Sequence, residues 1–245
     1  MKGTGHGVLV TGGAKRSGKA IACAFAEAGW RVAVHCNQSR KEADALVKTL
    51  SGKGHCVVQG DFRSEQDCER LISELVAAKF PLRCLVNSAA VYLRGKLESA
   101  EMAKIREIYQ VNFFAPFELM RQFHNIVGEG VIVNLLDQRV AVTEPDASVY
   151  NFSKKSLRDA TEACALAWAP AIRVNGVAPG IVLPPPGGSV RKMRPLLSKI
   201  PMGERTTEED VAAAVLWLAQ GKLTGNILYL DGGLHLTQGV ESPLQ

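Results

Sequence analysis

The sequence predicts one α/β domain in which a doubly wound parallel sheet of about seven strands carries helices on both faces. Short β-branched runs alternate along the chain with longer stretches of helical periodicity, an order that requires β-α-β crossovers between parallel strands. The length of 245 residues allows one large core, and no shift in composition divides the chain. A content of 47% hydrophobic and 22% charged residues is ordinary for a globular protein. We therefore assign residues 1–245 to a single domain of the Rossmann type.

The first half of the chain contains four expected strands, each followed by one or two helices. In the first helix, Ala20, Ile21 and Ala24 recur at the spacing of one helix face, and Gly29 ends the helix. Ser64 is placed to cap the third helix, with Asp67 in its first turn. The expected elements are strand Val8–Thr11, helix Ser17–Ala28, strand Arg31–Cys36, helix Arg40–Leu50, strand Cys56–Gln59, helix Ser64–Ala78, strand Leu82–Asn87, and helices Ala100–Phe113 and Pro116–Val127.

The second half repeats this order, but one of its connections is long and rich in proline. That irregular stretch runs from Gly180 to about Arg205, beyond the carboxyl end of a strand, where doubly wound sheets bind their ligands. Connections of this length are commonly functional, so we expect residues 180–206 to form a substrate lid, with plain disorder as the alternative. The expected elements are strand Val131–Leu135, helix Ser148–Trp168, strand Ile172–Ala178, helix Thr207–Ala219 and strand Ile227–Leu230.

The net charge and the cysteine content indicate which kinds of molecule the protein binds. A formal charge of +5, scattered along the chain, suits an anionic cofactor and does not indicate nucleic-acid binding. The six cysteines show neither C-x-x-C nor finger spacing, and the histidines form no metal set, so no metal is expected. The N-terminus has no signal-peptide profile, and no apolar run reaches the roughly 20 residues that cross a bilayer. We expect a reduced, cytoplasmic protein that acts on a small molecule and not at a membrane.

A glycine-rich turn, Thr11-Gly12-Gly13-Ala14-Lys15-Arg16-Ser17-Gly18, lies between the first strand and its helix. Glycines let the backbone approach a pyrophosphate, and the helix N-terminus adds unpaired N–H groups and a positive dipole end. The spacing differs from G-x-G-x-x-G, so the prediction depends on the position of the turn in the first strand-turn-helix unit. We expect the phosphates of a dinucleotide to contact Thr11, Gly12, Lys15, Arg16, Ser17 and Gly18.

The end of the second strand indicates which dinucleotide binds. An enzyme that uses NAD places an acidic residue here to accept from the ribose 2′-hydroxyl, and this chain has none. Lys15, Arg16, Ser39 and Arg40 could instead surround a 2′-phosphate with charge-assisted donors, while solvated loop charges are the alternative. We therefore expect NADPH as the cofactor, with His35 and Asn37 on the adenosine side.

Tyr150 and Lys154 lie four residues apart, which places them on one face of a helix. A lysine beside a tyrosine favours the phenolate and lowers the phenol pKa from about 10. We therefore expect Tyr150 to exchange a proton near neutral pH.

Taken together and in this order, the motifs resemble the short-chain dehydrogenase/reductase family from Val8 to about Leu236. Asp231-Gly232-Gly233 matches the C-terminal signature of that family. The resemblance implies a general acid at Tyr150, a ribose-binding lysine at Lys154 and a water-organising asparagine at Asn112. It also implies cofactor contacts at Asp61 and Phe62 near the adenine, at Asn87, Ser88 and Ala89 after the fourth strand, and at Pro179, Gly180 and Val182 near the nicotinamide.

Two departures from the family pattern refine the expected chemistry. Arg16 stands where most members have the middle glycine, and Asp137, thirteen residues before Tyr150, stands where most have the catalytic serine. That serine donates a hydrogen bond to a carbonyl that becomes an oxyanion, whereas an ionised aspartate can only accept and would repel the growing charge. A carboxyl group suits a substrate that gains a proton on nitrogen, so we expect reduction of a C=N bond with Asp137 near the amidine edge of a heterocycle.

Arg16 together with Asp137 is similar to the pteridine reductases and the bacterial dihydromonapterin reductases. This resemblance implies reduction of a dihydropterin to a tetrahydropterin, with Arg16 near both the pyrophosphate and the substrate. Those enzymes carry a stacking aromatic residue two places beyond Ala89, where this chain has Val91 followed by Tyr92. Either Tyr92 supplies the ring, or the substrate is not a pterin.

Two other functions remain open at this point. The first is a ketone or 3-oxoacyl thioester reductase of the same family, in which Asp137 is a neutral variant or Gln138 supplies the hydrogen bond. The second is a protein that binds NADPH without catalysis. A protein of that kind would have no need of Asn112, Tyr150 and Lys154, so their presence argues against it. The resemblance also implies a homotetramer or a homodimer.

Overall fold

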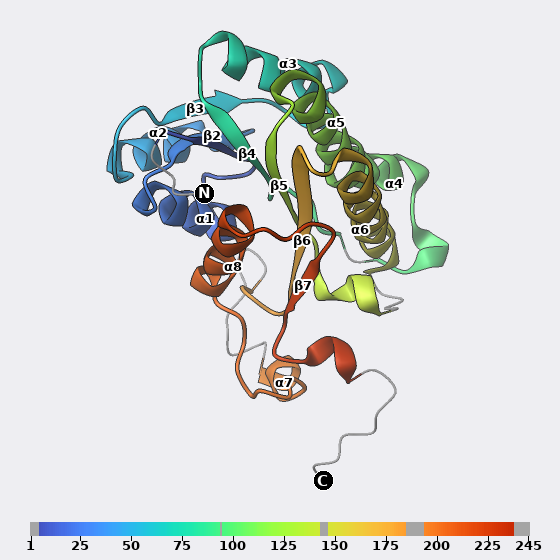
Figure 1. Ribbon diagram of the computed structural model, residues 1–245. Helices are drawn as coiled ribbons and strands as arrows, with labels where there is room; N and C mark the ends of the chain where they lie inside the picture. The colour runs from blue at the N-terminus through green and yellow to red at the C-terminus, as the bar shows by residue number, and fades with distance from the viewer. Residues whose placement is uncertain (1–4, 94, 143–146, 185–193, 238–245) are drawn as a thin grey trace.

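All seven strands of the sheet formed by the described residues run in the same direction. The computed structural model describes residues 5–93, 95–142, 147–184 and 194–237. The strands pair in the order β3-β2-β1-β4-β5-β6-β7, and each neighbouring pair is parallel. The strands are β1 (Gly7–Val10), β2 (Arg31–Cys36), β3 (Cys56–Gln59), β4 (Leu82–Asn87), β5 (Gly130–Leu135), β6 (Ile172–Pro179) and β7 (Ile227–Leu230), as Figure 1 shows.

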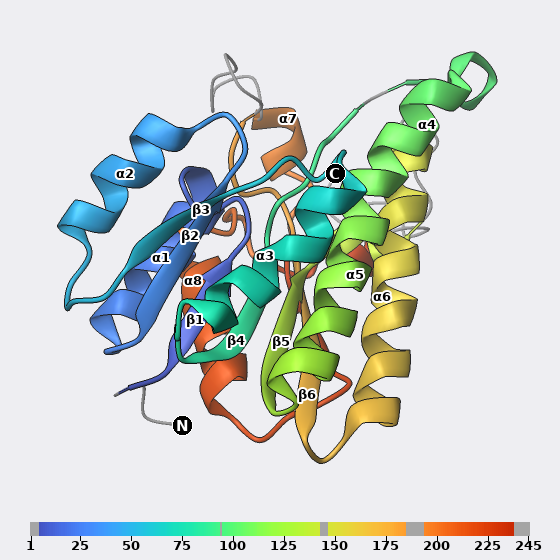
Figure 2. The same cartoon turned by 90° about the horizontal axis from the view of Figure 1, so that it is seen from above.

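Helices cover both faces of this sheet, so the predicted doubly wound architecture is confirmed. In Figure 2, α1, α2 and α8 lie on one face, while α3, α4, α5 and α6 lie on the other. The helices are α1 (Arg16–Glu27), α2 (Arg40–Thr49), α3 (Glu65–Ala77), α4 (Met102–Tyr109), α5 (Ala115–Gln122), α6 (Ser148–Trp168) and α8 (Glu208–Gln220). These bounds agree with the predicted ones to within one residue, apart from the helices before β5.

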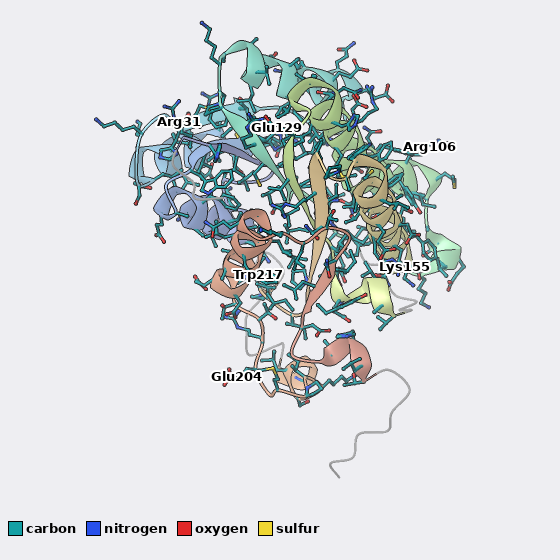
Figure 3. The ribbon with its side chains drawn as sticks, viewed as in Figure 1. Arg31, Arg106, Glu129, Lys155, Glu204 and Trp217 are labelled. Atoms are coloured by element: carbon teal, nitrogen blue, oxygen red, sulfur yellow. The ribbon has the colours of Figure 1, made fainter. Side chains whose placement is uncertain are left out.

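Each face of the sheet buries its own apolar layer. Successive residues of a strand point to opposite faces, so Val8 and Val10 pack with α1 and α8 while Leu9 packs with α3 and α5. Both layers are shielded from water, which explains why the central strands read as continuous apolar runs. In Figure 3 the side chains fill the space between sheet and helices, and Arg106 of α4 lies at the outer edge.

The two helices expected before β5 instead form one continuous helical run. Two π segments, η2 (Gln110–Phe114) and η3 (Phe123–Val127), follow α4 and α5 without a break. Pro116, in the first turn of α5, has no N–H to donate, and the wider π turn before it accommodates that loss without ending the helix. The predicted break between residues 113 and 116 was therefore wrong.

Short elements complete the fold, three of them 3-10 helices: η1 (Leu97–Ser99), η4 (Gln138–Ala141) and η7 (Leu234–Leu236). The expected lid also contains a short helix, α7 (Arg194–Leu197), whereas residues 185–193 lie outside the described part of the chain. None of the helices in the described ranges combines the length and the apolar character that crossing a bilayer requires.

Parallel strands end at one edge of the sheet, and this edge brings the predicted site residues together. The turn after β1, the ends of β2 and β3 and the segments after β4, β5 and β6 all lie there. The chain reverses its winding between β1 and β4, which is where doubly wound sheets open a crevice for a ligand.

Candidate active site

The turn after β1 is held in a shape that only glycine permits at two positions. Gly12 has a φ of +62°, and a Cβ there would lie 3.0 Å from the Cα of Ala89. A Cβ on Gly18 would lie 2.3 Å from the Gly12 carbonyl oxygen. The Thr11 hydroxyl oxygen accepts hydrogen bonds from the N–H groups of Ser88 and Ala89, at 2.9 and 3.0 Å, which ties the turn to the end of β4.

The N-terminus of α1 suits an anion. Its first turn contains no acidic residue, and Lys15 at the N-cap makes no capping hydrogen bond through its side chain. The first N–H groups of a helix need partners, and an anion can supply them. The predicted contacts Ser17 and Gly18 lie in this same first turn. The backbone around the turn therefore fits a diphosphate.

Arg16 adopts a backbone conformation that is unusual for a residue with a side chain. Its φ is +52°, in the left-handed region that glycine occupies freely. A strained residue of this kind costs about 1 kcal/mol or more. The Arg16 guanidinium donates to the carbonyl oxygen of Pro184 at 3.1 Å, so it joins the turn to the start of the expected lid.

A cavity of about 240 Å³ lies beside the turn, where the 2′-phosphate is expected. It is lined by Gly12, Ala14, Lys15, His35, Cys36, Asn37, Gln38 and Ser39. Lys15 is paired with Glu42 at 2.7 Å, and Arg40, which follows Ser39 in the sequence, is paired with Asp44 at 3.0 Å. Exposed pairs of this kind contribute about 0–1 kcal/mol, so a phosphate could compete for both cations.

His35 lines this cavity although its side chain is almost wholly buried. Its Nδ1 accepts from the Gly12 N–H at 3.1 Å, which leaves the proton on Nε2 to donate to the Gly60 carbonyl oxygen, also at 3.1 Å. The ring stacks on Phe62 with centroids 4.3 Å apart. Burial lowers the His35 pKa to about 4, so the neutral ring holds the turn after β1 against the end of β3.

Asp61, the expected adenine contact, forms an ion pair with Arg63. Its carboxylate accepts from the Arg63 guanidinium, and this hydrogen bond lowers the Asp61 pKa. Asp61 lies with Phe62 at the rim of the same edge of the sheet, directly after β3.

Asn112 is wholly buried in the π segment η2 and fixes the chain after β4. Its Oδ1 accepts from the Val91 N–H at 2.8 Å, and its Nδ2 donates to the Val91 carbonyl at 2.9 Å and to the Ser153 hydroxyl at 3.2 Å. At the end of β4, the Asn87 amide donates to the Asn134 amide at 2.8 Å. The predicted water-organising role of Asn112 stays a prediction, whereas its contact with the segment before Tyr92 was not anticipated.

Tyr150, Lys154 and Asp137 meet where β5 ends and α6 begins. The Tyr150 hydroxyl donates to Asp137 Oδ2 at 3.2 Å, and the Lys154 ammonium donates to the Leu135 carbonyl oxygen at 2.7 Å. Tyr150 is 7% exposed and Lys154 is 2% exposed. The sequence therefore identified three side chains that the fold brings together.

The predicted direction of the Tyr150 pKa was wrong for the chain without ligand. Burial and the nearby Asp137 carboxylate raise the Tyr150 pKa well above 10, while burial lowers the Lys154 pKa to about 8. The prediction assumed that lysine would be the closest charge, but Asp137 is the group that the phenol contacts. Tyr150 consequently keeps its proton at neutral pH and is a donor.

Tyr92 forms the open side of this cluster. Its ring meets Tyr150 edge-on with centroids 4.8 Å apart, and the Arg139 guanidinium carbon lies 5.9 Å from the Tyr92 ring centroid. Tyr92 is 46% exposed, while Val91 is held by Asn112. Of these two residues, Tyr92 is the one that presents an aromatic surface at the site.

The end of β6 closes the site from the other side. A Cβ on Gly180 would lie 2.7 Å from the Asp231 Cβ, and the Gly180 N–H donates to the Leu230 carbonyl at 2.9 Å. Pro179 is the last residue of β6, and the Val182 carbonyl accepts from the Arg205 guanidinium. This close approach requires glycine after β6.

Comparison with known proteins identifies the family of this chain. The family profile described as enoyl-(acyl carrier protein) reductase matches residues 12–235. An uncharacterized oxidoreductase of Thermotoga maritima is 31% identical, over 95% of this chain and 98% of its own. The 3-oxoacyl-[acyl-carrier-protein] reductase FabG of Staphylococcus aureus is 27% identical, over 93% of this chain and 97% of its own. The chain belongs to the short-chain dehydrogenase/reductase family.

Among solved structures, the FolM alternative dihydrofolate reductase 1 of Brucella canis, complexed with NADP, is highly similar to this member of the short-chain dehydrogenase/reductase family. The TM-score is 0.91, the identity is 33%, and the match covers all of both chains. Membership establishes the protein as an oxidoreductase. Within the described ranges, no three His, Cys, Asp or Glu side chains gather into a candidate metal centre.

Sequence reasoning did not anticipate that Arg139 contacts Asp137 in this short-chain dehydrogenase/reductase. Its backbone N–H donates to Asp137 Oδ1 at 2.9 Å, and its Nη1 lies 3.2 Å from Asp137 Oδ2. The sequence shows that Arg139 follows Asp137 by two residues, but the contact between them depends on the extended backbone of Asp137 and on the 3-10 turn that follows. Neither feature has a pattern in the sequence.

Proposed function

We propose that the protein uses NADPH to reduce a C=N bond of a pterin-like heterocycle, converting a dihydropterin to a tetrahydropterin. The observation that carries this proposal is the Asp137 carboxylate, which replaces a hydroxyl donor and accepts a hydrogen bond from the Tyr150 hydroxyl at 3.2 Å. A carboxylate at the reacting group suits N–H donors of a substrate and opposes a developing oxyanion.

The cofactor assignment rests on the chemistry of the turn and the cavity. Backbone N–H groups at the start of α1 suit a diphosphate, and Lys15 and Ser39 border the cavity beside it. No acidic residue lines that cavity to bind a free ribose 2′-hydroxyl. The Brucella canis relative, which shares the whole fold, was crystallised with NADP.

The overall reaction balances as C=N plus NADPH plus a proton, giving CH–NH and NADP⁺. When bound, NADPH supplies the hydride that adds to the carbon of the C=N bond. Tyr150 donates its proton to the nitrogen and recovers one from solvent, a role for which its raised pKa keeps it protonated. Lys154 binds the ribose, and Asp137 accepts from the amidine N–H groups of the ring.

The exposed ring of Tyr92 supplies the apolar wall that a flat heterocycle requires. It lies edge-on to Tyr150, so a ring stacked on Tyr92 would be near the proton donor. Arg16 links the cofactor turn to Pro184, and from there it can reach both the diphosphate and the substrate.

A second candidate function is reduction of a ketone or a 3-oxoacyl thioester. The observation that favours it is the burial of Asp137, which raises the pKa of its carboxyl and so favours the protonated acid, a group that could donate to a carbonyl oxygen. The FabG relative of Staphylococcus aureus carries the name of such an activity.

NADPH consumption separates the two candidates. We expect turnover with dihydrobiopterin and little with cyclohexanone or acetoacetyl thioesters. Tyr150→Phe should lower kcat by about 10²–10⁴-fold because the proton donor is lost. Tyr109→Phe, a tyrosine of α4 outside the cluster, is the matched control and should retain wild-type turnover. Reduction of ketones alone would refute the C=N proposal.

A further inference from the structure

Arg139 reaches Asp137 through two kinds of contact. Asp137 caps the 3-10 helix η4 by accepting the Arg139 backbone N–H at 2.9 Å. The cap turns the Arg139 side chain back, and its Nη1 lies 3.3 Å from Oδ1 and 3.2 Å from Oδ2 of the same carboxylate. The partners are two residues apart, so little additional chain order is needed to hold them together.

The pair is largely shielded from water. The side chain of Asp137 is 15% exposed and that of Arg139 is 21% exposed. Tyr150 closes one side through its hydrogen bond to Oδ2, and the Tyr92 ring lies under the guanidinium. Shielded pairs are screened less by solvent and salt than surface pairs, so removing one partner has a larger effect on the other.

Arg139 favours the ionised form of Asp137. Burial raises the Asp137 pKa and so favours the protonated acid, and the Arg139 charge is the largest opposing influence. A protonated aspartic acid could donate to a carbonyl oxygen, as the family serine does, whereas the ionised form can only accept. The neighbouring guanidinium thereby opposes the form of Asp137 that could donate to a carbonyl oxygen.

We propose that Arg139 is a specificity-determining positioning residue, which holds Asp137 as an ionised acceptor beside Tyr150 and so selects substrates with an N–H edge over substrates with a carbonyl oxygen. This inference rests on the proposed function for its substrate class. The effect of Arg139 on the ionisation of Asp137 is a property of the protein alone and does not depend on the substrate.

Among the residues that the structure describes, the other charged groups around Asp137 do not replace Arg139. The helix η4 packs against α6, β6 and η7. From α6, Tyr150 contributes a neutral donor, and the Lys154 ammonium opposes burial less than Arg139 does. The β6 arginine, Arg173, is bound to carbonyls at the opposite end of its strand, and the η7 histidine, His235, is paired with Asp231.

The first test observes Asp137 directly, without substrate. Infrared spectroscopy with ¹³C-labelled aspartate follows the protonated carboxyl band against pH, and Asp137→Asn assigns that band. We expect Asp137 to be ionised at pH 7 in the wild type and to titrate at least about one pH unit higher in Arg139→Gln. A protonated Asp137 in the wild type at pH 7, or equal titration in both proteins, would overturn the proposal even if the variant folds poorly.

The second test measures selectivity as the ratio of kcat/KM for dihydrobiopterin to that for cyclohexanone. Arg139→Gln should lower this ratio about tenfold at pH 7, and Arg139→Lys should restore part of it because the charge returns. Arg158→Gln is the matched control, since Arg158 also bonds to η4, through the Val140 carbonyl at 3.0 Å. An unchanged ratio in Arg139→Gln would contradict the proposal. If the wild type reduces no dihydropterin, the proposed function fails while the infrared titration still decides the role of Arg139.

Discussion

Among the described residues, four groups act on the Asp137 carboxylate: the Tyr150 hydroxyl, the backbone N–H and the guanidinium of Arg139, and the Lys154 ammonium. Tyr150 keeps its proton because its own pKa is raised, so the phenol is a donor whose acceptor is already in place. When a substrate offers N–H groups to Asp137, the phenol proton becomes available for the nitrogen that is reduced. In the proposed mechanism, the proton donor Tyr150 and the recognition group Asp137 are thus adjacent but separate.

His35 allows a test of how the cofactor turn is supported. Its pKa is about 4 in the folded chain, against an ordinary value of 6.5. Between these pH values the unfolded chain binds a proton that the folded chain excludes, so stability rises with pH across the window. Acidification from pH 6.5 to 4 should therefore cost roughly 3 kcal/mol at this residue.

Chemical denaturation of His35→Asn at pH 4.5 and pH 7 checks this expectation. At pH 7 the variant should be less stable than the wild type, and the difference should shrink at pH 4.5 because asparagine has no proton to gain. His55→Asn is the control, since His55 also accepts a backbone hydrogen bond, from Val32 at 3.0 Å, but is more exposed. A difference between His35→Asn and wild type that does not change with pH would refute the assignment of a buried neutral ring.

At the scale of elements, local patterns predicted the strands, most helices and the Ser64 cap. Ser64 accepts from the Asp67 N–H at 3.2 Å, as its position before an apolar helix indicates. The continuous run through Pro116 was not predictable, because a π turn is set by the packing of the helix and not by a local motif. The fold of α6 onto β5 brought Asp137 against Tyr150, a contact that spacing alone suggested but could not orient.

The turn after β1 packs closely against the first residues of α1, and the variant Gly18→Ala tests this contact. Alanine usually stabilises a helix by about 1 kcal/mol relative to glycine. Here its Cβ would lie 2.3 Å from the Gly12 carbonyl oxygen, so the turn must shift. We expect the free energy of unfolding to fall by about 1–3 kcal/mol and NADPH affinity to weaken.

The control for this variant is Gly95→Ala, because a Cβ on Gly95 would meet no atom within 4 Å. Urea denaturation and NADPH titration of both variants give the comparison. Stabilisation by Gly18→Ala, with normal NADPH binding, would show that the close contact in the turn does not constrain the site.

At the scale of the whole molecule, the parallel sheet explains why one edge holds the whole candidate site. Seven strands that end together bring the turn after β1, the Asn112 contact and the Asp137 cluster to one crevice, although these residues lie far apart in the sequence. The sequence order of motifs was enough to predict this edge, since β-α-β topology fixes where each strand ends. The partner of each charged side chain was not predictable, because it depends on how the side chains pack at that edge.

The most direct test of the central claim is the change of specificity in Asp137→Ser, which replaces the acceptor with a hydroxyl donor. Steady-state NADPH oxidation should be measured for dihydrobiopterin and for a ketone with both the wild type and this variant. We predict that the variant loses at least about tenfold in kcat/KM for dihydrobiopterin and gains relative activity toward the ketone. A variant that reduces dihydrobiopterin as well as the wild type, with the same preference over the ketone, would contradict the account.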